Sequence, residues 1–271
     1  MTDLQQRLLS MLEWFHNYCV KEGITYYAVG GTVIGATRHN GFIPWDDDID
    51  LALPREDYNR LLRILNEPIG GYFLESPYTG ANDYLYTYAK LYDQSSILVE
   101  KTKYLCRRGI YIDIFPIDNL GNTKEEAINN FKHFDRINMF LMMRTCVKRE
   151  GRAWYKNLSI TLADIIPSFI VNNKKLSIKL DKIANNIHIK NTDSEFVANM
   201  MGTYRDREIT RREYFGTPIL HKFESIEIFI PAKYDDYLTA IYGDWRELPP
   251  LKKRKTNHDF VEFDLNNSYL V

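Results

Sequence analysis

Apolar side chains recur at helical spacing at the start of the chain and predict an amphipathic helix over residues 3–21. Gly23 follows this segment and is a typical helix stop, because glycine adopts the left-handed conformation without strain. We expect this helix to pack on a sheet through its apolar face, which consists of Leu4, Leu8, Leu12 and Phe15.

The next segment, residues 26–53, alternates between strand and turn signals. Its apolar start, residues 26–29, predicts a short strand that turns at Gly30-Gly31 into a helical segment, and Asn40-Gly41 predicts the next turn. The run from Asp48 to Leu53 predicts a second strand. Because side chains alternate across a strand, we expect Asp48 and Asp50 to project from the same face.

Beyond this segment the pattern predicts alternating helices and strands and then a long helical region. We expect a helix from Pro54 to about Asn66, strands over residues 72–75, 84–93 and 110–115, helices throughout residues 124–190, a strand over residues 226–230 and a helix over residues 231–242. The helical region carries no motif that indicates chemistry, and we interpret its basic residues, such as Arg144, as a solvated helix face.

Composition and charge exclude several classes of protein. The chain has 271 residues, of which 45% are hydrophobic, so it is long and apolar enough for a sizeable core. Its 35 Lys and Arg residues balance 36 Asp and Glu residues, which argues against nucleic acid as a partner. The odd cysteine count, with no closely spaced pair, argues against a disulfide framework and predicts the cytoplasm.

The longest apolar stretch of the chain bears on contact with a membrane. The N-terminus lacks the features of a secretory signal, and the longest apolar stretch, residues 160–171, is too short to cross a bilayer. It fits either an ordinary pair of buried helices or a segment that lies on a membrane surface, because Lys156 and Lys174-Lys175 flank it. No stable protein partner is expected.

The aspartates after Trp45 are candidates for a metal site. Two carboxylates held side by side repel each other unless a cation lies between them, and oxygen ligands without Cys or His favour Mg²⁺ or Mn²⁺. The alternative is a solvated acidic surface. A calcium loop that starts at Asp46 fits poorly, because it puts Leu51 at the position of the required Gly and Asp57 at that of the usual Glu.

Two charged residues in apolar strands extend this candidate site. Asp113 interrupts an otherwise apolar strand, so it is either a structural carboxylate or a third acidic site residue. Lys90 fits either an edge position, with its ammonium group in water, or a contact with a substrate phosphate. Asp118, which follows Pro116, is predicted to lie in a turn.

Together these residues suggest metal-assisted transfer of a phosphoryl-type group from a nucleotide. Asp48 and Asp50 would hold one or two Mg²⁺ ions, and the Gly30-Gly31 turn would let backbone N–H groups approach the phosphates. Asp113 would complete the metal shell or take the proton of an attacking hydroxyl. The basic residues of the same unit are Arg38, His39 and Lys90, and the sequence contains no P-loop motif.

Three motifs of the chain resemble those of the LicD family of phosphotransferases. They are the segment from Gly30-Gly31-Thr32 through Arg38-His39 and Trp45-Asp46 to Asp50, the segment from Gly109 to Asp118, and the closing Tyr242-Gly243-Asp244-Trp245 with Leu248-Pro249-Pro250, Arg254 and His258. Gly30-Gly31-Thr32 is closer to the general nucleotidyltransferase pattern than to the residues of many family members.

The resemblance implies an α+β fold with a nucleotidyltransferase-like mixed sheet flanked by helices. We expect a single catalytic domain over residues 1–271, in which residues 1–123 form the core, residues 124–195 a helical insertion, and residues 196–271 the return to the core.

The resemblance also implies transfer of phosphocholine, or a similar phospho-alcohol, from CDP-choline or another CDP-alcohol to a hydroxyl of a bacterial cell-surface glycan or its lipid-linked precursor. Asp48, Asp50 and Asp113 would be the metal-binding and catalytic residues. The implied donor contacts are Gly30, Gly31, Thr32, Arg38 and Lys90, and the implied substrate contacts are His39, Trp45, Asp46, Arg254 and His258.

Other functions remain as alternatives. They are transfer of ribitol phosphate, glycerol phosphate or a nucleoside monophosphate by the same fold, and a catalytically silent glycan-binding protein. The expected location is the cytoplasm, with peripheral contact at the inner face of the plasma membrane.

Overall fold

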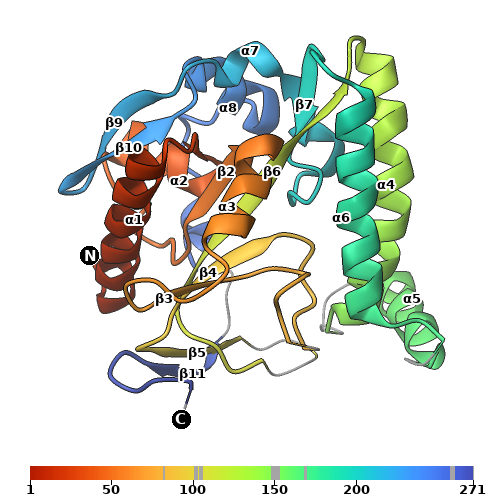
Figure 1. The fold of residues 1–271 in the computed structure, drawn as a ribbon, viewed down its shortest axis with the longest axis horizontal. Coiled ribbons are helices and arrows are strands. Elements are labelled where there is room, and N and C mark those ends of the chain that lie inside the picture. The colour runs from red at the N-terminus through yellow and green to blue at the C-terminus, as the bar shows by residue number, and fades with distance from the viewer. Residues whose placement is uncertain are drawn as a thin grey trace.

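A mixed sheet at the centre of the protein carries the candidate site (Figure 1). The computed structural model describes residues 1–81, 83–100, 103, 106–147, 153–167, 170–256 and 260–270. The central strands run in the order β1-β2-β6-β4-β3, and β7 and β8 extend the sheet from β6. Their bounds are β1 Tyr27–Ala28, β2 Asp50–Pro54, β3 Tyr72–Glu75, β4 Ala89–Asp93, β6 Tyr111–Gly121, β7 Phe196–Ala198 and β8 Thr210–Arg211.

Strands β2 and β6 are parallel, and the other pairs of this sheet are antiparallel. A parallel pair needs a long connection. Here α3 (Arg55–Ile64), β3, β4 and β5 (Ile97–Glu100) lie between the two strands in the chain. The fold is therefore α+β with a mixed sheet flanked by helices, as the sequence predicts.

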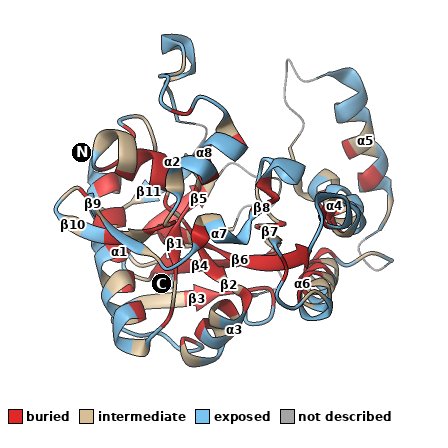
Figure 2. Cartoon of the chain, turned by 90° about the horizontal axis from the view of Figure 1, so that it is seen from above, coloured by how far each residue is buried: buried red, intermediate tan, exposed pale blue. Residues whose placement is uncertain are grey.

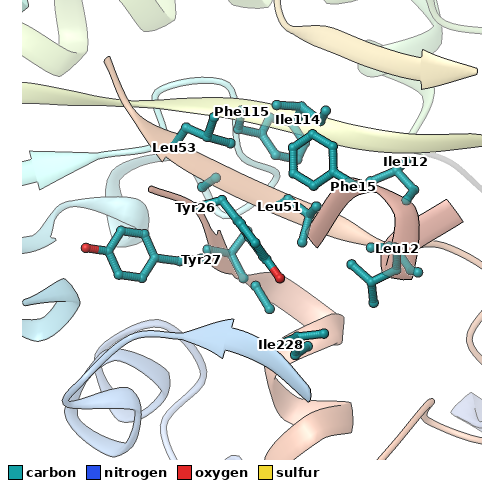
Figure 3. Close-up of a cluster of buried hydrophobic side chains, with 14 of the residues drawn as sticks. Leu12, Phe15, Tyr26, Tyr27, Leu51, Leu53, Ile112, Ile114, Phe115 and Ile228 are labelled. Atoms are coloured by element: carbon teal, nitrogen blue, oxygen red, sulfur yellow. The ribbon is translucent and has the colours of Figure 1, made fainter. Parts of the chain in front are cut away.

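Helix α1 (Asp3–Glu22) covers one face of the sheet through its apolar positions. Its first turn is closed by a capping box of Thr2 and Gln5, and it ends at Gly23, which has a φ of 63°. Figure 3 shows Leu12 and Phe15 of this helix packed among Leu51 of β2 and Ile112 of β6. The predicted helix over residues 3–21 and its packing on a sheet are confirmed.

The long helices α4 (Lys124–Thr145) and α6 (Asn173–Lys190) pack side by side, and the shorter α5 (Trp154–Ile165) lies beyond them (Figure 1). Their apolar residues, with Leu120 of β6 and Ala198 of β7, form a second hydrophobic cluster. Arg144 of α4 is buried here and donates hydrogen bonds to Asn173 Oδ1 and to backbone carbonyls of residues 163, 166 and 171. Our interpretation of Arg144 as part of a solvated face is wrong.

A buried ion network joins this helical region to the sheet. Both carboxylate oxygens of Asp118 accept hydrogen bonds from Arg55 at 2.6 Å, and Asp181 of α6 accepts a third at 2.7 Å. Asp118 lies within β6 and is fully buried, so its assignment to a turn is wrong. Arg55 from α3 neutralises the Asp118 charge, which allows this carboxylate to be buried within the strand.

The C-terminal part of the chain folds back onto both ends of the sheet. It contains α7 (Arg212–Phe215), the hairpin of β9 (Ile219–Phe223) and β10 (Ile226–Ile230), α8 (Tyr234–Tyr242), and β11 (Phe260–Asp264), which pairs with β5. The predicted strand over residues 226–230 is confirmed, and the predicted helix over residues 231–242 begins three residues later. The predicted strand over residues 84–93 is shorter, because β4 starts only at Ala89.

Candidate active site

The turn after β1 places two glycines against the acidic loop. Helices α2 (Gly30–Ile34) and a π-helical turn (Gly35–His39) follow β1, and the chain reverses at Asn40 in the left-handed conformation. Gly30 has a φ of 58°, and a Cβ atom there would lie 2.7 Å from Asp50 Oδ2. At Gly31 a Cβ atom would lie 2.6 Å from Asp46 Oδ2. Glycine is therefore required because the carboxylates approach the backbone closely.

The register of the central strands gathers the predicted carboxylates. Asp50, the first residue of β2, pairs directly with Asp113 of β6, and the Asp113 N–H donates to the Ile49 carbonyl at 3.0 Å. Asp48, Asp50 and Asp113 line the same cleft, whose volume is about 220 Å³. Thr32 holds the backbone of this site, because its Oγ1 accepts a hydrogen bond from the Asp50 N–H at 2.9 Å.

Asp50 carries a charge that the surrounding protein does not compensate. Burial raises its pKa well above the usual range, and the carboxylates of Asp48, Asp113 and Asp46 raise it further, against the opposing effect of Lys90. Within the described part of the chain, no group donates a hydrogen bond to the Asp50 carboxylate. A cation in this cleft would relieve the repulsion, so the donor set fits a hard divalent ion.

The carboxylates are arranged in two overlapping groups. The oxygens of Asp46, Asp47 and Asp48 lie within 4.8 Å of one another, close enough for one ion. Asp50 and Asp113 line the cleft next to them, although among the described residues they do not belong to that close group. Gln5 of α1 anchors the loop, because its side-chain amide donates to the Asp46 carbonyl at 2.9 Å.

Lys90 neutralises Asp113 from the neighbouring strand. It lies opposite Asp113 in the β4–β6 pair, it is buried, and its Nζ lies 2.6 Å from Asp113 Oδ1. The ammonium group also lies 3.5 Å from the centre of the Tyr111 ring and 4.2 Å from that of Tyr86. The edge position, one of our two interpretations of Lys90, is wrong, because β4 is an inner strand between β3 and β6.

The remaining predicted residues form a basic and aromatic cluster outside that cleft. The Arg38 guanidinium donates to the carbonyls of Trp245 and Glu247, and His39 packs edge-on against Trp45. Arg254 lies 5.6 Å from the centre of the Trp45 ring. Burial lowers the pKa of Arg38, and the nearby Arg254 charge lowers it further. His258 lies outside the described residues.

The sequence interpretation missed several residues that line the cleft. Besides the aspartates, the wall includes Tyr204, Glu208, Tyr237 and Tyr242, together with Tyr88 and Asn199. Glu208 ends a short 3-10 helix (Arg205–Glu208), and no alternation or motif marks it. Only Tyr242 belonged to a motif that we recognised.

A larger cavity, of about 660 Å³, lies at the carboxyl ends of β2 and β6. Its polar side chains already serve the fold. His188 accepts a hydrogen bond from the Asn119 N–H and pairs with Glu56, while Arg212 donates to the Ser194 carbonyl and to Asn119 Oδ1. The smaller cleft is the better candidate because it combines clustered carboxylates with a glycine turn packed against them.

Comparison with known proteins identifies the family of this chain. The family model described as LicD/FKTN/FKRP, nucleotidyltransferase domain, matches residues 23–140. The chain is 30% identical over 254 residues, which are 92% of each chain, to the lipopolysaccharide cholinephosphotransferase LicD of Haemophilus influenzae. It therefore belongs to the LicD family. Over 35 residues, 13% of this chain and 7% of the relative, it is 49% identical to the ribitol 5-phosphate transferase FKRP of Mus musculus.

Proposed function

We propose that this protein transfers phosphocholine, or a similar phospho-alcohol, from a CDP-linked donor to a hydroxyl of a cell-surface glycan or its lipid-linked precursor. The observation that carries the proposal is the direct pairing of Asp50 with Asp113, in a cleft that Asp48 also lines. The similarity to a cholinephosphotransferase over 92% of the chain supports the choice of reaction.

A divalent ion, Mg²⁺ or Mn²⁺, would be held by Asp48 and Asp50, with Asp113 and the close group of Asp46 and Asp47 beside them. Bound there, it would neutralise the diphosphate of the donor. The two neighbouring glycines keep the backbone close to these carboxylates and leave no side chain in the way of the phosphates.

Asp113 is placed to take the proton of the acceptor hydroxyl. Burial raises its pKa, while Lys90 opposes this effect and favours the ionised form that a base requires. Its Oδ1 accepts a short hydrogen bond from Lys90, 2.6 Å, while its Oδ2 accepts a long one, 3.4 Å, from the Tyr88 hydroxyl, which the acceptor hydroxyl would replace. As the acceptor oxygen bonds to phosphorus, the bond from phosphorus to the CMP oxygen breaks, CMP leaves, and the acceptor proton moves to Asp113 and then to solvent.

The basic and aromatic cluster is our proposed contact for the donor phosphates and base. Arg38 and Arg254 bring positive charge together, whereas burial and then the Arg38 charge lower the pKa of His39, whose Nε2 accepts a hydrogen bond from Arg38 Nε at 3.0 Å. An anion would relieve this repulsion, and the Trp45 ring offers a surface for stacking. We propose that the donor lies between this cluster and the acidic cleft.

We also propose that the reaction takes place at the inner face of the plasma membrane. In the described part of the chain, no helix combines the length and apolar character needed to cross a bilayer. Helix α5 nevertheless presents an exposed apolar face, shown at the edge of the molecule in Figure 2. A lipid-linked acceptor would be reached most directly from a membrane surface.

The proposal is tested by mixing the purified protein with Mn²⁺, a lipid-linked or free glycan acceptor, and CDP-choline, CDP-ribitol or CDP-glycerol, and measuring CMP. We expect metal-dependent CMP release and transfer of the labelled alcohol phosphate, and a loss of at least about 100-fold in Asp48→Asn and Asp113→Asn. The exposed Asp206→Asn is the matched control. Full activity of Asp48→Asn, or activity without any metal, would refute the mechanism.

Ribitol phosphate is the second candidate for the transferred group. The 49% identity over 35 residues to a ribitol 5-phosphate transferase favours it, although that match covers a small part of the chain. The same assay separates the candidates by donor.

A further inference from the structure

Besides the aspartates, the wall of the cleft contains tyrosine rings and one buried carboxylate. Tyr204, Tyr237 and Tyr242 line it together with Glu208. The Tyr204 and Tyr242 rings meet edge to face with 4.8 Å between their centres. The pKa values of Tyr237 and Tyr242 are raised by burial and by neighbouring charges, which include Glu208 and Asp50, so this wall is continuous with the acidic site.

Glu208 is buried without a cation. It is 9% exposed, and its Oε1 accepts one long hydrogen bond, 3.4 Å, from the Tyr204 N–H. Among the described residues, Glu208 forms no ion pair and Oε2 accepts no hydrogen bond. Burial raises the pKa of Glu208 to about 7. A buried carboxylate that stays unpaired is costly to the fold, so its position calls for a positively charged partner from outside the chain.

The backbone nearby is shaped to admit this carboxylate. At Gly202 a Cβ atom would lie 2.3 Å from Glu208 Oε1, so a larger residue would displace the side chain. The Gly30 backbone lies beside the Tyr237 hydroxyl and lowers the pKa of that hydroxyl, against the larger effect of burial. The exposed Arg207 lies 5.7 Å from the centre of the Tyr204 ring, so this ring already holds one cation near it.

We propose that Glu208 and the rings of Tyr204, Tyr237 and Tyr242 form a subsite for the cationic head group of the donor alcohol, a quaternary ammonium. Aromatic rings attract such a cation through their electron-rich faces, and a carboxylate adds charge without the need for a hydrogen bond from the ligand. The cleft, about 220 Å³, is smaller than the roughly 300–1,000 Å³ of pockets that enclose a whole ligand. This volume suits a head group, while the nucleotide lies outside. The inference rests on the proposed transfer of a phospho-alcohol.

The test compares CDP-choline with its neutral isostere, CDP-3,3-dimethylbutanol, in which carbon replaces the nitrogen. We expect the wild type to prefer CDP-choline in kcat/KM, and both Glu208→Gln and Tyr204→Leu to reduce this preference on the order of ten-fold. Tyr204→Phe keeps the ring and should retain the preference, as should the control Asp206→Asn on the same turn. If the protein turns over CDP-choline but Glu208→Gln and Tyr204→Leu keep the wild-type preference, the proposed subsite is overturned and the proposed transfer reaction stands.

A binding measurement keeps the two proposals separable. Calorimetry compares phosphocholine with 3,3-dimethylbutyl phosphate in the presence of Mn²⁺. If the protein releases no CMP from any donor but binds phosphocholine selectively, and loses this selectivity in Glu208→Gln, the subsite stands and the proposed reaction falls. If CDP-ribitol or CDP-glycerol is used better than CDP-choline, phospho-alcohol transfer stands and the cationic subsite is overturned.

Discussion

At the scale of single residues, Asp50 is placed where function conflicts with stability. Its carboxylate begins β2, opposite Asp113, and nothing in the described chain donates a hydrogen bond to it. Active sites commonly accept such repulsion because the charges are needed by a ligand. The same cost is avoided at Asp113, where Lys90 supplies the opposite charge.

This conflict predicts the behaviour of Asp50→Asn. Without metal, the free energy of unfolding of the variant should be roughly 1 kcal/mol larger than that of the wild type, because the substitution removes the buried repulsion between carboxylates. Added Mn²⁺ should raise the melting temperature of the wild type but not that of Asp50→Asn. Thermal unfolding with and without Mn²⁺ measures both effects, and Asp206→Asn should behave like the wild type. An equal metal-induced rise in Asp50→Asn would remove Asp50 from the metal site.

Glu208 predicts a pH dependence of stability. Its pKa is raised from 4.5 to about 7 in the folded state, so the folded protein holds the proton more tightly than the unfolded chain. The resulting stability is present below about pH 4.5 and is lost as the pH rises through 7. Between pH 5 and pH 8 the free energy of unfolding of the wild type should fall by up to about 3 kcal/mol relative to that of Glu208→Gln. Urea unfolding at both pH values measures the difference in free energy of unfolding between the two proteins. The same difference at pH 5 and pH 8 would contradict the prediction.

At the scale of elements, α5 differs from its neighbours α4 and α6 because it exposes a row of large apolar side chains. Trp154 is 75% exposed, Leu162 56% and Ile165 69%, and Tyr155 and Leu158 extend the same exposed face. An ordinary buried helix pair, one of our two interpretations of this stretch, does not fit this exposure. Lys156 of α5 and Lys175 of α6 are exposed nearby in the chain, which favours an anionic lipid surface as the partner.

Replacement of the apolar face of α5 tests this membrane contact. The double variant Leu162→Glu/Ile165→Glu should bind vesicles of phosphatidylglycerol and phosphatidylethanolamine at least about ten-fold more weakly than the wild type, because apolar burial and charge attraction are both reduced. Flotation measures the bound fraction. Leu220→Glu on β9, which replaces another leucine that is about half exposed, is the matched control. Equal binding by the double variant would exclude α5 as the contact.

At the scale of the whole molecule, Arg55 links three elements that are distant in the chain. It lies at the start of α3, binds Asp118 of β6 through two hydrogen bonds, and reaches Asp181 of α6. The network therefore fixes α6 against the sheet that carries the candidate site. Our division of the chain into a core, a helical insertion and a C-terminal return stays a proposal, because these contacts cross its boundaries.

Loss of Arg55 should be costly. Arg55→Met leaves two buried carboxylates without their cation, so we expect a loss of about 3–5 kcal/mol in the free energy of unfolding by urea. The triple variant Arg55→Met/Asp118→Asn/Asp181→Asn should recover part of this loss, because the uncompensated charges are gone. Arg60→Met, which removes an exposed arginine of the same helix, is the control. A loss below about 1 kcal/mol in Arg55→Met would contradict the network's role.

Local patterns determined much of this protein. The spacing of Leu8, Leu12 and Phe15 defined α1, and the alternation around Asp113 identified a buried strand. These predictions succeed because helix and strand periods act over a few residues. The LicD family was likewise readable from motifs that are continuous in the chain.

Only the tertiary structure decided which distant residues meet. It paired Asp50 with Asp113, gave Lys90 to Asp113, placed Asp118 in the core with Arg55, and brought Glu208 to the cleft. The physical reason is that the cost of a buried charge depends on the neighbours supplied by other strands and helices, and strand register sets those neighbours. A sequence pattern shows that a charge lies in an apolar segment, whereas the fold determines which opposite charge, metal ion or ligand compensates it.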